Sequence, residues 1–145
     1  MKAVCILLCG FLYSANLLAS AAESCPAVES ITLNAGIYTA PANQAGSEWI
    51  AVSSAASAPR LVSFEAGVFY PENNQQGSVG KIGYCEYKAQ DRSRVNLHYR
   101  QGSAQESSMR LLNPENWTFI ESGLGLNLYE CTASNSGACA FSIVK

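Results

Sequence analysis

Apolar and polar residues alternate at every second position along most of this chain. Residues 30–41 set Ile31 and Leu33 between polar neighbours, and the segment then bends at Gly36 into a second alternating run. Alternation of this kind is typical of strands that bury one face. No window of about a dozen residues keeps the period of about 3.6 residues that marks an amphipathic helix. The pattern therefore predicts an all-β protein.

Turn-forming residues divide this alternation into short strands. The predicted strands lie within residues 30–41, 48–54, 60–70, 81–89, 94–101, 108–113, 117–122, 126–130 and 139–145. The segments 81–89 and 94–101 flank QDRS and are predicted to pair as a hairpin. Short strands with a turn about every dozen residues favour an antiparallel β-sandwich or an open barrel, built as a single domain.

The first 21 residues have the pattern of a secretory signal peptide. Lys2 supplies a positive charge, residues 4–18 are mostly apolar, and residues 19–21 are the small residues that precede a cleavage site. We place cleavage after Ala21, so that residues 22–145 form one exported domain, periplasmic or extracellular. The apolar run is short for a membrane span, and no later stretch approaches the roughly 20 apolar residues required. The sequence therefore predicts an exported protein that does not span the membrane.

The cysteines support this location. Cleavage removes Cys5 and Cys9 and leaves an even set, Cys25, Cys85, Cys131 and Cys139. An even number of cysteines in an exported chain indicates disulfides, because thiols are oxidised outside the cytoplasm. Four cysteines allow three pairings, and we favour Cys131–Cys139, which are neighbours across a short loop, together with Cys25–Cys85.

The Cys131–Cys139 pair is predicted to close a hairpin. Strand-like residues 126–130 and 140–144 flank the small, turn-prone residues 132–138. A disulfide across this loop stabilises the fold by about 2–3 kcal/mol in the chain-entropy treatment. Zinc is the alternative for paired cysteines, but it prefers C-x-x-C pairs or histidine partners, and His98 is far from every cysteine in sequence. We predict no metal and no other cofactor.

Catalytic motifs are absent from the sequence. There is no G-x-S-x-G, no H-E-x-x-H and no phosphate-binding glycine loop followed by a helix. In residues 94–101, Val95 and Leu97 share one side of the predicted strand and His98 lies on the polar side. We interpret His98 as a surface residue, because nothing in the sequence holds a nucleophile or carboxylate beside it. The sequence therefore favours a protein that is not an enzyme.

The net charge and the aromatic residues indicate which kinds of partner the protein could bind. The formal net charge is −2 and the basic residues are scattered, which argues against nucleic-acid binding. The candidate ligand-contact residues are Trp49, Tyr84, Trp117 and His98. The alternative interpretation places Trp49 and Trp117 in the core, where aromatic rings bury the most area. It does not decide whether Tyr84 lies in the core or on the surface. Tyr84 and Tyr87 fall on opposite faces of their strand, with Tyr87 on the side of Cys85.

Several segments together resemble a known family. They are ESCP after the signal peptide, GIYTAP, EWIAVSS, LVSFEAGVFYP, GYCEY, VNLHYR, NWTFIES and YECTASNSGACAF. In this order they resemble domain-of-unknown-function family 3757 (DUF3757), a group of small exported bacterial proteins. The resemblance covers nearly all of the chain after the signal peptide. It implies location, size and cysteine pattern, and it brings no activity or catalytic residues.

Two functions from different classes remain open. We favour a small exported non-enzymatic binding protein that acts on a protein, glycan or lipid partner. The alternative is a small secreted hydrolase or hydrolase inhibitor, such as a virulence-associated exoprotein. A deep pocket around His98 with a carboxylate in hydrogen-bond reach would favour the enzyme. A flat aromatic patch near Trp49 or Tyr84 would favour the binding protein.

Overall fold

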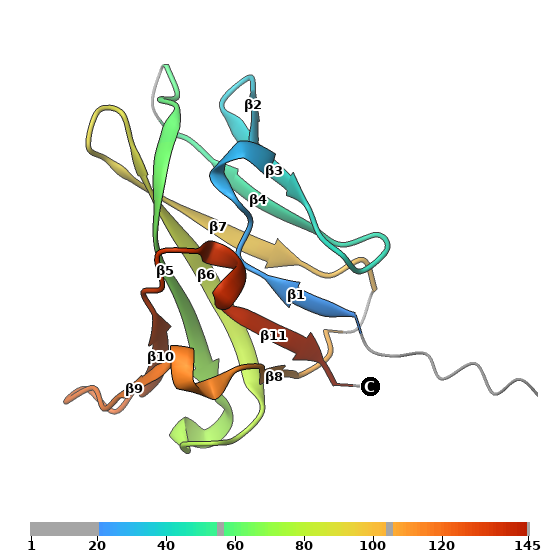
Figure 1. Cartoon of the computed structure of the whole chain (residues 1–145), viewed down its shortest axis with the longest axis vertical. Coiled ribbons are helices and arrows are strands. Elements are labelled where there is room, and N and C mark those ends of the chain that lie inside the picture. Colours follow the sequence, from blue (N-terminus) through green and yellow to red (C-terminus); the bar gives the residue numbers. More distant parts are fainter. Residues whose placement is uncertain (1–20, 55–56, 104–105, 145) are drawn as a thin grey trace, which may run out of the picture.

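The computed structural model of the chain describes residues 21–54, 57–103 and 106–144. Within these residues the protein is an all-β antiparallel domain whose sheet curls into a half-barrel (Figure 1). The described helical turns are short 3-10 turns, as the missing 3.6-residue period predicts. Of the predicted signal peptide, all but Ala21 lies outside the described residues.

The strands follow the predicted segments closely. They are β1 (Ala22–Ser24), β2 (Thr32–Asn34), β3 (Ile37–Pro41), β4 (Glu48–Val52), β5 (Leu61–Pro71), β6 (Gly80–Ala89), β7 (Arg94–Arg100), β8 (Met109–Leu111), β9 (Thr118–Ile120), β10 (Leu128–Cys131) and β11 (Ala140–Ile143). The 3-10 turns are η1 (Val28–Ser30), η2 (Glu72–Asn74), η3 (Pro114–Asn116) and η4 (Ser136–Ala138). Every predicted segment contains a strand, and β1 is the strand that the alternation did not predict.

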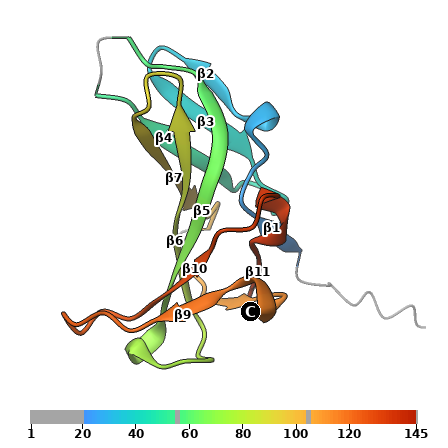
Figure 2. The ribbon, with the colours of Figure 1, turned by 60° about the vertical axis from the view of Figure 1, so that its left-hand side comes forward.

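The sheet branches at β6. One edge of β6 pairs with β5, which continues through β10 to β9. The other edge pairs with β7 at Cys85–Lys88 and with β8 at Gly80. From β7 the sheet continues through β4 and β3 to β2, and from β8 it continues through β11 to β1. These arms leave β6 in different directions, so the sheet wraps around a core (Figure 2).

A bulge at Gly83 shapes the centre of this sheet. Tyr84 pairs with Val68 while Ile82 pairs with Phe69, so Gly83 is an extra residue on β6. The bulge lets Ile82 and Cys85 both face the core, where each is nearly fully buried. A Cβ atom at Gly83 would lie 2.4 Å from Cε2 of Tyr70, so no larger residue fits there without displacing that ring.

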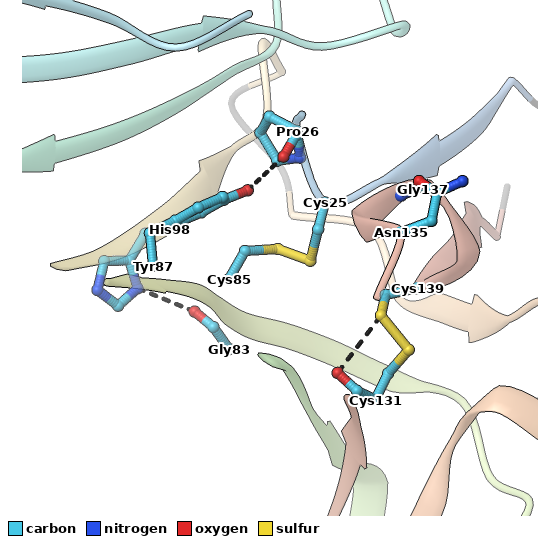
Figure 3. Close-up of a disulfide and its surroundings, with 10 residues drawn as sticks. All are labelled: Cys25, Pro26, Gly83, Cys85, Tyr87, His98, Cys131, Asn135, Gly137 and Cys139. Atoms are coloured by element: carbon cyan, nitrogen blue, oxygen red, sulfur yellow. Dashed lines mark hydrogen bonds between the residues drawn. A yellow bond between two sulfur atoms is a disulfide. The ribbon is translucent and has the colours of Figure 1, made fainter. Parts of the chain in front are cut away.

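The two disulfides are the predicted ones, Cys25–Cys85 and Cys131–Cys139 (Figure 3). They lie side by side in the core against Gly67, which pairs with Cys131 on one side and Cys85 on the other. A Cβ atom on Gly67 would lie 3.1 Å from Sγ of Cys25 and 3.3 Å from Cβ of Cys139. Glycine at this position therefore makes room for both disulfides in one layer.

The hairpin predicted around Cys131 and Cys139 is wrong. β10 pairs with β5 and β9, whereas β11 pairs with β1 and β8. Between the cysteines the chain forms η4, in which Oδ1 of Asn135 accepts the N–H of Gly137 at 3.0 Å. The turn-prone residues form this 3-10 turn, but other strands occupy the hydrogen-bonding edges of β10 and β11. The disulfide thus joins two arms of the branched sheet.

Aromatic rings fill the core. Trp49 is 1% exposed and Trp117 is 5% exposed, which confirms the interpretation that placed both in the core. The ring of Trp49 packs edge-on against Tyr99 at a centroid distance of 5.2 Å. Tyr87 is fully buried, its hydroxyl donates to the carbonyl of Pro26 at 2.6 Å, and burial raises its pKa. Tyr87 is therefore a neutral hydrogen-bond donor that ties β6 to the segment after β1.

Candidate functional site

The four predicted ligand-contact residues do not form one site. Trp49 and Trp117 are covered by the core, whereas Tyr84 is half-buried and His98 is exposed on the outer face of β6 and β7. The rings of Tyr84 and His98 meet edge-on with their centroids 6.1 Å apart. Burial, and then the neighbouring Tyr70, Glu86 and Glu130, raise the pKa of Tyr84. The outer face thus presents a small aromatic pair, as the alternation predicts for His98.

His98 forms a hydrogen bond to the main chain through one of its ring nitrogens. Nδ1 lies 2.9 Å from the carbonyl oxygen of Gly83, the bulged residue of β6, so Nδ1 donates to that oxygen (Figure 3). The ion pairs among the described residues join Lys81 to Glu106, Arg94 to Glu86 and Arg100 to Glu48, and none of them includes His98. The Gly83 carbonyl orients the ring, but neither this hydrogen bond nor these ion pairs join His98 to a carboxylate or a nucleophilic side chain, as a general base requires.

A polar cleft opens beside His98 where β4 and β7 separate. The two strands pair only between Glu48–Ile50 and His98–Arg100. Beyond this point they leave a cleft of about 450 Å³, whose walls include Val52, Asp91 and Asn96. The Asp91 carboxylate accepts the hydroxyl and N–H of Ser93, and these bonds lower its pKa. Asp91, an acid that lines the cleft, is therefore hydrogen-bonded within its own turn.

His98→Ala is expected to change the free energy of unfolding by less than about 0.5 kcal/mol, because the side chain is exposed and its one hydrogen bond is solvated. Leu97→Ala, one residue away on the buried face, is the matched control and should cost about 2–5 kcal/mol. Urea unfolding of both variants measures this difference. A loss for His98→Ala comparable to that of the control would show that His98 supports the fold.

A second cavity lies at the open mouth of the half-barrel, between η1, β2 and the start of β5. Its volume is about 550 Å³. The apolar side chains that line it are Val28, Ile31, Leu33 and Leu61, with the buried ring of Tyr38. Tyr38 pairs with Leu33 across β2 and β3, so both side chains face the inside of the curl. We call this cavity the mouth.

Two charged residues, Glu29 and Arg60, also line the mouth, and both are exposed. The hydroxyl of Tyr38 donates to the carbonyl of Pro59 at 2.5 Å, which fixes the ring against the chain that leads into β5. The mouth is thus a hollow of mixed character, lined by apolar side chains and by two charged ones. Sequence analysis missed it because its walls come from segments some thirty residues apart, and alternation alone cannot tell which apolar side chains stay uncovered.

Glu23 is a buried acid that sequence analysis also missed. It is 2% exposed, and its carboxylate accepts the N–H groups of Asn43 and Gln44 at 3.0 and 2.5 Å. The hydroxyl of Tyr99 lies 3.2 Å from the same carboxylate. Burial mainly, with a smaller contribution from the Glu23 charge, raises the pKa of Tyr99 to about 12, so the phenol remains a donor at neutral pH. All these contacts anchor β1, and they leave Glu23 engaged in the fold.

These features define a small disulfide-bonded β-domain with an open cavity, the mouth. The domain begins after residue 20, which is consistent with export. The family described as "Protein of unknown function (DUF3757)" matches residues 20–142, and the chain belongs to this family. Neither the curated proteins nor the solved structures contain a match.

Residues 21–54, 57–103 and 106–144 contain no helix that is long and apolar enough to cross a membrane. The same residues contain no group of three or more His, Cys, Asp or Glu side chains placed to hold a metal ion.

Proposed function

We propose that this protein is a non-enzymatic exported binding protein whose ligand site is the mouth. The observation that carries the proposal is a cavity of about 550 Å³ that Val28, Ile31, Leu33 and Leu61 line together with two charged residues. Ligand sites in proteins are hollows of roughly 300–1,000 Å³ with mostly apolar walls and a few polar groups that fix orientation. The walls built by Val28, Ile31, Leu33 and Leu61 match this description, and Arg60 and Glu29 are the polar groups.

The lining also selects the class of ligand. Apolar walls gain free energy by covering an apolar group, at about 25 cal/mol per Å² removed from water. A glycan offers mainly hydroxyl groups, which need many hydrogen-bond partners, whereas five of the seven lining residues are Val, Ile, Leu or Tyr. An apolar side chain of a protein partner, or an acyl group, therefore suits the mouth better than a sugar. The hydrolase alternative has less support, because His98 bonds to a main-chain carbonyl and lines a different, polar cleft.

Binding of 8-anilinonaphthalene-1-sulfonate to the folded, oxidised protein tests the mouth. We expect a saturable rise in dye fluorescence that Leu33→Asp weakens at least about tenfold, equivalent to about 1.4 kcal/mol. Leu33 is 38% exposed on an edge strand, so the replacement should leave the fold intact.

The matched control is Val52→Asp. Val52 is 74% exposed and lies on the outer face of the same arm of the sheet, paired with Ile37. It should leave the titration unchanged. No saturable binding, or an equal loss in both variants, would contradict the proposal that the mouth is a ligand site.

A further inference from the structure

The loop between β9 and β10 projects from the body of the protein and carries exposed leucines (Figure 2). Leu124 is 97% exposed and Leu126 is 52% exposed. Residues 122–127, Ser-Gly-Leu-Gly-Leu-Asn, include no charged side chain. We call these six residues the tip. A single exposed leucine is ordinary, but two exposed leucines in one uncharged loop make a small apolar patch whose burial by a partner is favourable.

The tip is held in place by hydrogen bonds. Nδ2 of Asn74, in η2, donates to the carbonyl of Gly125 at 2.7 Å. Asn127 donates its N–H to Oδ1 of Asn74 at 3.1 Å and its Nδ2 to the carbonyl of Asn74 at 3.0 Å. Within the loop, the N–H of Gly125 reaches the carbonyl of Ser122 at 3.0 Å. A loop fixed in this way loses little conformational entropy when it binds, so its two leucines are presented ready to dock.

The mouth, which apolar side chains line, lies at the other end of the molecule from the tip. The tip lies at the lower end of the long axis, and η1, β2 and the start of β5, which build the mouth, lie at the upper end (Figures 1 and 2). A tip and a mouth at opposite ends cannot meet within one molecule. They can meet between two copies.

One pair of opposite charges favours this contact. Exposed Glu121 adjoins the tip, and exposed Arg60 lines the mouth. Neither belongs to an ion pair among the described residues. Glu29, the other charge at the mouth, lies on η1. Because Glu29 repels Glu121 and Arg60 attracts it, a docked tip is oriented with Glu121 toward Arg60. The acidic neighbours of the tip, Glu121 and Glu130, disfavour an anionic lipid surface as the occupant.

We propose that the tip of one copy docks into the mouth of a second copy, with Leu124 and Leu126 against the apolar walls. This inference rests on the proposed ligand site and names its occupant as this chain itself. The contact is heterologous, since each copy contributes a different surface, and repetition builds an open head-to-tail chain along the long axis unless the rotation closes a ring. The interface is small, so association is weak and depends on concentration.

Sedimentation velocity of the oxidised protein across a concentration series tests the contact. We expect the wild type to form species larger than a dimer as its concentration rises toward about 1 mM, the range in which a weak contact is populated. The tip variant Leu124→Asp with Leu126→Asp, and the mouth variant Leu33→Asp, should each weaken association at least about tenfold. Val52→Asp should associate like the wild type.

Mixing the two blocked variants is the decisive step. The tip variant keeps an intact mouth and the mouth variant keeps an intact tip, so an equimolar mixture should form one contact and stop at a dimer. A monomeric wild type, unchanged association of the tip variant, or a mixture that stays monomeric would each overturn the proposal. Leucine-dependent binding to phosphatidylcholine vesicles by a monomeric wild type would overturn it in favour of a lipid surface. If the dye still binds at the mouth while self-association fails, the inference falls and the proposed ligand site stands.

Discussion

Replacement of Cys25 and Cys85 by alanine is expected to lower the free energy of unfolding by about 4 kcal/mol. The disulfide joins residues separated by 60 positions, so its removal releases a long loop in the unfolded chain. In the chain-entropy treatment the stabilisation grows with the logarithm of this separation. The same bond ties the segment after β1 to the branching strand β6, so the N-terminal arm is expected to loosen as well.

The matched control is Cys131→Ala with Cys139→Ala, which removes the same atoms from the same buried layer. Here the separation is only 8 positions, and the expected loss is about 2.5 kcal/mol. Urea unfolding of both variants, under conditions that keep the remaining disulfide oxidised, gives the comparison. Equal losses, or a larger loss for the short loop, would show that native packing around Gly67 outweighs loop length.

Glu23→Ala is expected to lower the free energy of unfolding by about 3 kcal/mol, because it removes a buried acceptor and leaves three part-buried donors without their partner. The carboxylate accepts the N–H groups of Asn43 and Gln44 and faces the hydroxyl of Tyr99. Its loss should release β1, whose ladder with β11 spans only three residue pairs. Urea unfolding measures the cost, and hydrogen exchange of the β1 amides reports the release.

Glu29→Ala provides the control, because Glu29 is an exposed acid six positions along the same segment and should change stability by less than about 0.5 kcal/mol. Glu23→Gln separates shape from charge. It keeps one oxygen acceptor but turns an NH₂ group toward a main-chain donor, so it should fall between the wild type and Glu23→Ala. A loss as small as that of Glu29→Ala would mean that water replaces the carboxylate without cost.

Local pattern was enough to locate most strands, because alternation depends only on which face of a strand is buried. The bend at Gly36 illustrates this, since Ala35 and Gly36 both adopt positive φ, 48° and 81°, in the two-residue turn between β2 and β3. β1 escaped prediction because it is three residues long and shows no alternation. The assignment of His98 to the outer face and of Leu97 to the core followed from the same period and is confirmed.

Local pattern did not predict which strands pair with one another. Residues 126–130 and 140–144 flank a turn-prone segment, and local signals favoured a hairpin between them. The hydrogen-bonding edges of β10 and β11 are instead taken by β5, β9, β1 and β8. Turn residues report that the chain reverses, but they carry no information about which distant strand competes for an edge.

The sequence by itself determined the all-β class, most strand segments and which four cysteines form disulfides, because these depend on short-range alternation and on the chemistry of exported cysteines. It favoured the observed pairing and the burial of the two tryptophans without deciding either. Only the tertiary structure decided that the sheet branches at β6, that Glu23 is buried among donors, that Leu33 lines an open mouth and that Leu124 stands in water at the tip. These features depend on which segments cover one another. Coverage is set by long-range contacts, and the alternation of Leu33 or Leu124 with its neighbours is the same whether a partner strand covers it or leaves it exposed.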